Sequence, residues 1–440
     1  MKKIGIVFSV LLTVVLMFTS CEKKEISFID QELYEQLMES GSSKDIVLDS
    51  NTAIKAASDL AWKEFKDAER RDEQLVYEMT NKQITFGSKT MRFDVKSVGM
   101  PGPNGYPLYI ALHGGGQTTP EFNDSQWNHM KIYYYDSVNS GIYVAPRGVS
   151  DTWDTHFNAE SYPMYERLIE IMSVYYGIDT NRVYLVGYSA GGDGVWQITP
   201  KMADRFAAAN MSAGHPNGSD LTNLYNTPFQ IQCGQNDNAV AGRNTECGRY
   251  CEVLDQLQYT YGGGYEHNVN IHFGKQHGIE DNDPLRSEQV ILTNPIEWSK
   301  GGEAITTTAD TNAVSFLERY RRNPIPEKIV WSIGNRPSEC DTETFYWLRA
   351  TKDISAGTIV ATYDKSKNTI NIERMIVLQD EGEIFVMLNA DMVDFTKPVT
   401  VIVNGIETEY NVTPSLEYIN KTIEERCDPN MIFAAEIKIR

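Results

Sequence analysis

Short apolar runs alternate with longer amphipathic stretches through the middle of the chain. The first clear apolar run is LYIALHG at 108–114, and the last is NVNIHFG at 268–274. Between them, apolar residues recur at helical spacing in 161–176, 190–204 and 243–259. This alternation is typical of a mostly parallel sheet with helices on both faces. We therefore predict an α/β domain of the α/β-hydrolase class over residues 81–325.

The pattern changes after Pro324-Ile-Pro326. Residues 326–440 contain short, mostly alternating segments separated by turn residues, which indicates β-strands. Asn404-Gly405 stands between two such segments and is typical of a two-residue hairpin turn. This region is predicted to be an all-β sandwich that forms a C-terminal accessory domain.

The N-terminal region divides into a leader and a helical segment. Two lysines, an apolar run from Ile4 to Phe18 and small residues before Cys21 are typical of a bacterial lipoprotein signal sequence. We expect removal of residues 1–20 and acylation of Cys21, which would tether an exported protein to a lipid membrane of the cell envelope. An ordinary secretory signal is the alternative. Residues 21–80 are predicted to be a tether and one or two helices beside the α/β domain.

Charge and cysteine content limit the partners. The chain has 60 acidic and 40 basic residues, and the resulting net charge of −20 would repel nucleic acid. None of the six cysteines stands in a Cys/His pattern with the spacing of a zinc site, so neither a metal nor another cofactor is expected. Cys340 and Cys427 can pair in an oxidising compartment.

A candidate nucleophile lies in VYLVGYSAGGDG, residues 183–194. Ser189 follows an apolar strand, sits in a G-x-S-x-G sequence and opens a helical stretch, which is typical of a nucleophile elbow. A serine nucleophile needs a base, an orienting acid and an oxyanion site. The HGGG sequence upstream predicts oxyanion donors in the backbone N–H groups of Gly115 or Gly116, with that of Ala190. His113 is interpreted as a residue that stabilises this loop.

The acid and the base are predicted from strand ends and chain order. Asp237 ends the stretch FQIQCGQND, where a strand runs into a turn, and is the predicted acid. Asp220 and Asp255 are alternatives, although one precedes this strand and the other lies in a helical pattern. His277 follows the last apolar run and is the predicted base, because this fold has the order serine, acid, histidine. His215 is the main rival, since it also ends a strand.

Three further residues near the same sheet edge are candidate substrate contacts. Arg147 ends a predicted strand, Trp153 lies in the loop after it, and Tyr188 precedes the nucleophile. Loops after strands line the site in sheets of this kind. For Arg147 and Trp153 the alternative roles are a salt bridge and a packed indole.

These motifs resemble those of a known group of proteins. HGGG, GYSAGGDGVWQITPKMADRF, SAGHPN and FYWL are similar to segments of exported bacterial α/β-hydrolases of the polyhydroxybutyrate depolymerase-like and feruloyl or acetyl-xylan esterase-like types. A more distant likeness is to prolyl oligopeptidase catalytic domains. The resemblance covers residues 100–325 and implies a triad of Ser189, Asp237 and His277. Related sequences often place Trp after this histidine, whereas this chain has Gly278.

The resemblance implies a serine hydrolase that cleaves carboxylic esters, with esters on polysaccharides as one substrate class. A serine peptidase of the prolyl oligopeptidase type is the alternative enzyme, although the region before residue 81 is too short for the propeller such enzymes usually carry. An inactive, glycan-binding lipoprotein is the non-enzymatic alternative. That interpretation requires a missing triad member, and none is missing.

Overall fold

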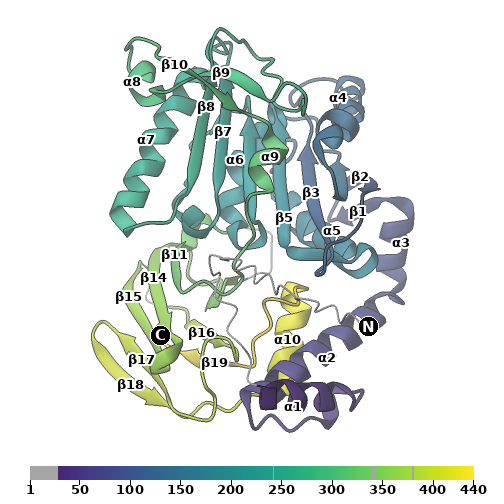
Figure 1. The fold of residues 1–440 in the computed structure, drawn as a ribbon, viewed down its shortest axis with the longest axis vertical. Coiled ribbons are helices and arrows are strands. Elements are labelled where there is room, and N and C mark those ends of the chain that lie inside the picture. Colours follow the sequence, from purple (N-terminus) through teal and green to yellow (C-terminus); the bar gives the residue numbers. More distant parts are fainter. Residues whose placement is uncertain (1–27, 241, 338–342, 379–380) are drawn as a thin grey trace, which may run out of the picture.

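The structure of the protein is a computed structural model (Figure 1). The structure describes residues 28–240, 242–337, 343–378 and 381–440. The predicted leader, Cys21 and Cys340 lie outside these residues, so their expected roles stay predictions. No helix within the described ranges is both long enough and apolar enough to cross a membrane.

A ten-stranded sheet forms the middle of the molecule, in the order β1-β2-β4-β3-β5-β6-β7-β8-β9-β10. The strands from β4 to β8 pair in parallel, while β1 and β2 at one edge and β9 and β10 at the other pair antiparallel. The strands are β1 (Gln83–Phe86), β2 (Lys89–Val98), β3 (Tyr106–Leu112), β4 (Gly141–Pro146), β5 (Ile178–Tyr188), β6 (Ala208–Ser212), β7 (Phe229–Gly234), β8 (His267–His272), β9 (Glu288–Leu292) and β10 (Thr306–Asp310). This order, with helices on both faces, is that of the α/β-hydrolase fold, as predicted.

Both faces of the sheet are buried because side chains alternate along each strand. On β3, Leu108, Ile110 and Leu112 belong to the core that includes α5, α6 and α7. Tyr109 and Ala111 belong to the opposite core, with α4 and α9. The helices of this region are α4 (Pro120–Tyr133), α5 (Ser161–Tyr176), α6 (Ala190–Lys201), α7 (Arg243–Tyr261), α8 (Pro295–Ser299) and α9 (Ala313–Leu317).

The C-terminal region contains two smaller sheets, ordered β11-β14-β15-β17-β18 and β12-β13-β16-β19. They meet through aromatic side chains, such as Trp331 and Phe345, whose ring centroids are 5.7 Å apart. The strands are β11 (Lys328–Ser332), β12 (Thr344–Phe345), β13 (Leu348–Ala350), β14 (Gly357–Asp364), β15 (Thr369–Val377), β16 (Ile384–Leu388), β17 (Val399–Val403), β18 (Ile406–Tyr410) and β19 (Ala435–Lys438). The region is β-rich as expected, but it also contains helix α10 (Leu416–Arg426). Ser415 caps this helix by accepting a hydrogen bond from the Tyr418 N–H.

The N-terminal helices are α1 (Phe28–Met38), α2 (Asn51–Glu69) and α3 (Glu73–Asn81). Only part of this segment packs as expected beside the α/β region: Leu75 of α3 joins its core. The buried face of α2, with Ala56, Ala57 and Leu60, instead shares a core with Ile419 and Ile423 of α10.

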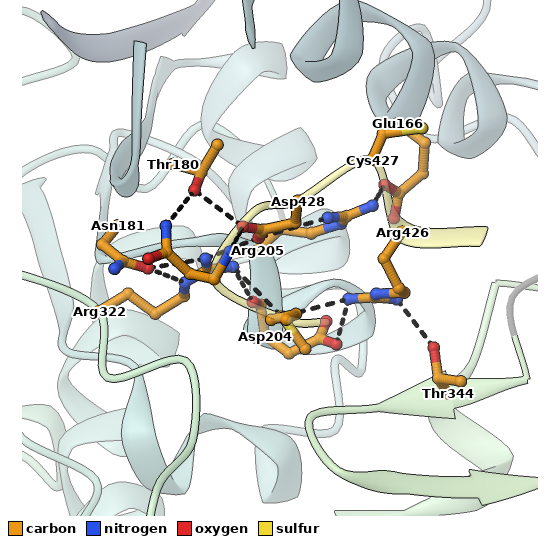
Figure 2. A network of polar contacts seen from close by, with 12 residues as sticks. Glu166, Thr180, Asn181, Asp204, Arg205, Arg322, Thr344, Arg426, Cys427 and Asp428 are labelled. Atoms are coloured by element: carbon orange, nitrogen blue, oxygen red, sulfur yellow. Dashed lines mark hydrogen bonds and ion pairs between the residues drawn. The ribbon is translucent and has the colours of Figure 1, made fainter. Parts of the chain in front are cut away.

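A buried ionic network joins the α/β region to the C-terminal region (Figure 2). Arg322 donates to Asp428 at 2.6 Å, and Arg205 lies 3.7 Å from the same carboxylate. Arg426 pairs with Asp204, which follows α6. Burial raises the pKa of Asp428, but the charges of Arg322 and Arg205 outweigh this and lower it overall. The network holds α10 and its C-terminal loop against the amino ends of β5 and β6.

Candidate active site

Ser189 lies in a strained turn between β5 and α6. Its backbone has φ 58° and ψ −120°, a conformation that residues other than glycine rarely adopt. The turn is crowded: a Cβ on Gly187 would come 2.3 Å from the carbonyl oxygen of Gly191, and one on Gly191 would come 2.0 Å from that of Leu112. These approaches explain the glycine on either side of the serine, and they raise the serine above the sheet edge.

The structure brings the three predicted triad residues together. The Nε2 atom of His277 lies 3.1 Å from the Ser189 Oγ, and its Nδ1 atom lies 2.8 Å from Oδ2 of Asp237. Both distances fit hydrogen bonds between a nucleophile, a base and an orienting acid. Asp237 is almost fully buried, whereas the His277 side chain is 46% exposed. The histidine therefore faces solvent while the carboxylate that orients it does not.

The rival residues have other partners. Asp220 accepts hydrogen bonds from Thr222, and Asp255 pairs with His267. His215 faces Asn217 through its Nδ1 atom. None of these groups contacts Ser189 in the part of the chain that the structure describes.

Arg243, at the start of α7, is a site residue that the sequence did not indicate. Its Nη1 atom lies 3.2 Å from Oδ2 of Asp237 and 2.9 Å from Nδ1 of His277. Burial raises the pKa of Asp237, but the hydrogen bond from His277 and the charge of Arg243 together lower it. The contact with Asp237 favours the imidazole tautomer with its proton on Nδ1, and Nε2 is then the nitrogen that faces the Ser189 Oγ. His277 and Arg243 together therefore favour the ionised form of Asp237.

The candidate oxyanion donors differ from those predicted in one respect. The Gly116 N–H donates to Oδ1 of Asn123 at 2.9 Å, so it is already occupied and the prediction for Gly116 is wrong. The Gly115 N–H and the Ala190 N–H have no acceptor among the described residues. Gly115 has φ +104°, and a Cβ there would lie 2.2 Å from the Asn123 oxygen, so this position requires glycine.

Arg147 supports the HGGG loop that carries one of the candidate oxyanion donors. Its side chain is 7% exposed, and it donates to Asp124 at 2.8 Å and to the carbonyl of Gly148 at 2.8 Å. It also pairs with Asp151, which accepts a hydrogen bond from Nδ2 of Asn123 at 2.8 Å. The expectation that Arg147 contacts substrate is therefore wrong, and the alternative of a salt bridge is confirmed.

His113 also stabilises the loop, as interpreted from the sequence. Its Nδ1 donates to the carbonyl of Gly114 at 2.6 Å, and its Nε2 accepts from the Gly148 N–H at 3.0 Å. Burial lowers the pKa of His113 to about 3, so the ring is neutral at physiological pH.

The two aromatic candidates have different surroundings. Trp153 is 51% exposed and rests edge-on against Phe157. Its carbonyl oxygen is 3.4 Å from where a Cβ on Gly116 would stand, so it borders the oxyanion loop. The Tyr188 hydroxyl donates to the carbonyl of His277 at 2.5 Å and accepts from the Ile279 N–H at 3.0 Å. Tyr188 therefore holds the loop of His277, and its hydroxyl is not available to a substrate.

Comparisons with known proteins give partial likenesses. No family model matches the chain. A bifunctional acetylxylan esterase/xylanase, XynS20E of Neocallimastix patriciarum, is 31% identical over 104 residues, which span 23% of this chain but only 15% of that protein.

Solved structures overlap with the chain at low TM-scores. A poly(3-hydroxybutyrate) depolymerase, LpqC of Bordetella parapertussis, has a TM-score of 0.37 and 15% identity, covering 56% of this chain and 98% of that one. A thermostable esterase has a TM-score of 0.36 and 18% identity, covering 56% of this chain and 64% of its own. The fold assignment rests on the strand order and the elbow.

Proposed function

We propose that the protein is a serine hydrolase that cleaves carboxylic esters. The observation that carries this proposal is the continuous chain of contacts from Asp237 through both nitrogens of His277 to Ser189. The unoccupied N–H groups of Gly115 and Ala190 support it, because a developing oxyanion needs donors that nothing else has taken.

The proposed reaction has two halves. His277 Nε2 accepts the Ser189 proton as Oγ attacks the ester carbonyl, and the new oxyanion is bound by Gly115 and Ala190. His277 then passes the proton to the leaving alcohol, which departs as the C–O bond breaks. Nε2 then takes a proton from water as the water attacks the acyl-enzyme, the bond between the acyl carbon and Ser189 Oγ breaks, and His277 returns the proton to Oγ as the carboxylic acid leaves. Asp237 orients the imidazole and stabilises its charged form.

The surroundings support an ester on a large or aromatic substrate. His277 is close to half exposed, and Trp153, whose backbone carbonyl borders the HGGG loop, is 51% exposed, so a sugar or an aromatic acyl group could stack on its indole. The likeness to an acetylxylan esterase/xylanase agrees with a polysaccharide-linked ester. We further propose that the protein is exported and anchored to a lipid membrane through Cys21, as its leader suggests.

A substrate panel tests the proposal. It comprises p-nitrophenyl acetate, a feruloyl ester, acetylated xylan and a prolyl-chromophore peptide, each assayed with the Ser189→Ala variant as the blank. We expect ester cleavage that the variant lacks. Cleavage of the peptide alone would instead favour a peptidase of the prolyl oligopeptidase type. No turnover of any substrate would favour an inactive, glycan-binding protein.

A further inference from the structure

Three side chains with metal-binding atoms lie close together between α7 and the start of β8. Cys251 and Asp255 lie one turn apart on this helix, and His267 is the first residue of β8 beside it. The His267 Nε2 atom is 3.3 Å from Asp255 Oδ1 and 4.0 Å from Cys251 Sγ. All three atoms lie within 4.8 Å of one another. The sequence spacing did not reveal this cluster, because the histidine comes from a different element.

A backbone hydrogen bond orients the His267 ring. Its Nδ1 donates to the carbonyl of Tyr265 at 2.8 Å, which leaves the Nε2 lone pair directed at the thiol and the carboxylate. A backbone carbonyl on the far nitrogen is the usual support of a metal-binding imidazole. The His267 side chain is 10% exposed, whereas that of Asp255 is 55% exposed, so the cluster has a closed side and an open one.

The separations are close to those of a tetrahedral site. Zinc bonds of about 2.1 Å to nitrogen and oxygen and about 2.3 Å to sulfur place neighbouring ligand atoms about 3.4 Å apart for N and O, and about 3.6 Å apart for S and N. The 3.3 Å between His267 Nε2 and Asp255 Oδ1 already fits. The 4.0 Å between Cys251 Sγ and His267 Nε2 needs a small rotation of the cysteine side chain.

The local charge favours a cation. The carboxylates of Asp255 and Glu297 lie close enough to Cys251 to act on it electrostatically. Glu297 belongs to α8, which packs against α7. The negative charge of these carboxylates favours a cation beside the Cys251 sulfur.

We propose that Cys251, Asp255 and His267 bind one divalent transition metal ion of the zinc class, with water at the fourth position. Sulfur, imidazole and carboxylate together select zinc over calcium or magnesium, which prefer oxygen ligands alone. The ion joins α7 to β8. Because Arg243 begins α7 and the loop of His277 follows β8, the metal would stiffen the two elements that set the imidazole beside Ser189. The ion itself lies outside the proposed reaction.

Metal titration of the full chain tests this proposal. The protein, prepared without a histidine tag and freed of metal with a chelator, is titrated with Zn²⁺ by calorimetry and with Co²⁺ by absorption. We expect one ion per chain and a thiolate-to-cobalt charge-transfer band, with a Tm that rises with the zinc concentration. Ester hydrolysis is not the readout, so the result does not depend on the proposed function.

Three variants map the ligands. Cys251→Ser should abolish the cobalt band, and Cys251→Ser and His267→Gln should each weaken zinc binding at least about 100-fold. Asp255→Asn changes an exposed side chain, keeps the fold and should weaken binding as well. His129→Gln, a change of an exposed histidine on α4, is the matched control and should bind as wild type. The proposal is overturned if the folded protein binds neither metal, or if binding persists in Cys251→Ser and Asp255→Asn.

Discussion

The two ends of the central sheet use polar groups in opposite ways. At the carboxyl ends of the strands, the Gly115 and Ala190 N–H groups have no acceptor among the described residues, and His277 is 46% exposed. At the amino ends, Arg322 and Asp428 pair in full burial against the C-terminal region (Figure 2). Unoccupied donors suit transient charge, whereas paired charges hold two regions together. We therefore expect substitutions at the first end to change activity and those at the second to change stability.

The largest effect is expected from Ser189→Ala. Removing the nucleophile should lower kcat for an ester roughly a million-fold, because the remaining residues act only as parts of the same unit. The Tm should stay close to that of wild type, since the Oγ is not needed for packing. Ser366→Ala, in an exposed turn of the C-terminal region, is the matched control and should retain full activity. A Ser189→Ala enzyme with near-normal kcat would contradict the proposed nucleophile.

Asp428→Ala should lower the stability of the protein and leave its activity nearly unchanged. It leaves the guanidinium group of Arg322 buried without its carboxylate, while Arg205 keeps its pair with Glu166, at a cost of about 3–5 kcal/mol in the free energy of unfolding. Urea unfolding measures that loss, and kcat/KM of the folded fraction at low temperature should stay within about twofold of wild type. A large loss of kcat/KM with unchanged stability would show that this network serves the chemistry.

Asn123→Ala tests the support of the oxyanion loop. The Gly116 N–H loses its acceptor and the loop that carries Gly115 loosens, so kcat should fall about 10- to 100-fold with little change in KM. Asn128→Ala on the exposed side of the same helix should have no effect. A rise in KM with unchanged kcat would assign Asn123 to substrate binding instead.

The pH dependence of stability supplies a further prediction, spread over several pH units. Burial lowers the pKa of His113 to about 3 and that of His272 to about 4, against about 6.5 in the unfolded chain. As the pH falls from about 6.5 to about 4, these two histidines become protonated in the unfolded chain but stay neutral in the folded one. Each histidine therefore costs about 1.4 kcal/mol of stability per pH unit in that window.

His272→Gln should remove one such contribution, so its free energy of unfolding falls less steeply with acid than that of wild type. Asp428, whose pKa is lowered in the folded protein, is ionised throughout that window. Its contribution is present above about pH 4 and is lost only below that. Urea unfolding at several pH values measures both slopes. Identical slopes for wild type and His272→Gln would contradict a neutral His272.

The sequence predicted what depends on local chain geometry. The elbow could be recognised because a serine with positive φ forces glycines onto fixed neighbouring positions. His277 and Asp237 could be predicted because each comes after a strand and because the order serine, acid, histidine is that of this fold. The role of Arg243 could not be predicted, because it depends on where α7 begins relative to His277. The occupied Gly116 N–H depends on the Asn123 rotamer, which no spacing encodes. Helix α10 was missed because the surrounding strands dominated the pattern.

The proposal that Ser189 is an activated nucleophile is tested most directly by labelling with a fluorophosphonate probe. The folded wild-type protein should gain a single phosphonyl group, located by peptide mass spectrometry on Ser189, as fluoride leaves. Asp237→Asn should label far more slowly, because the imidazole is then held in the wrong tautomer. A folded wild-type protein that does not label, or that labels elsewhere than at Ser189, would contradict the account.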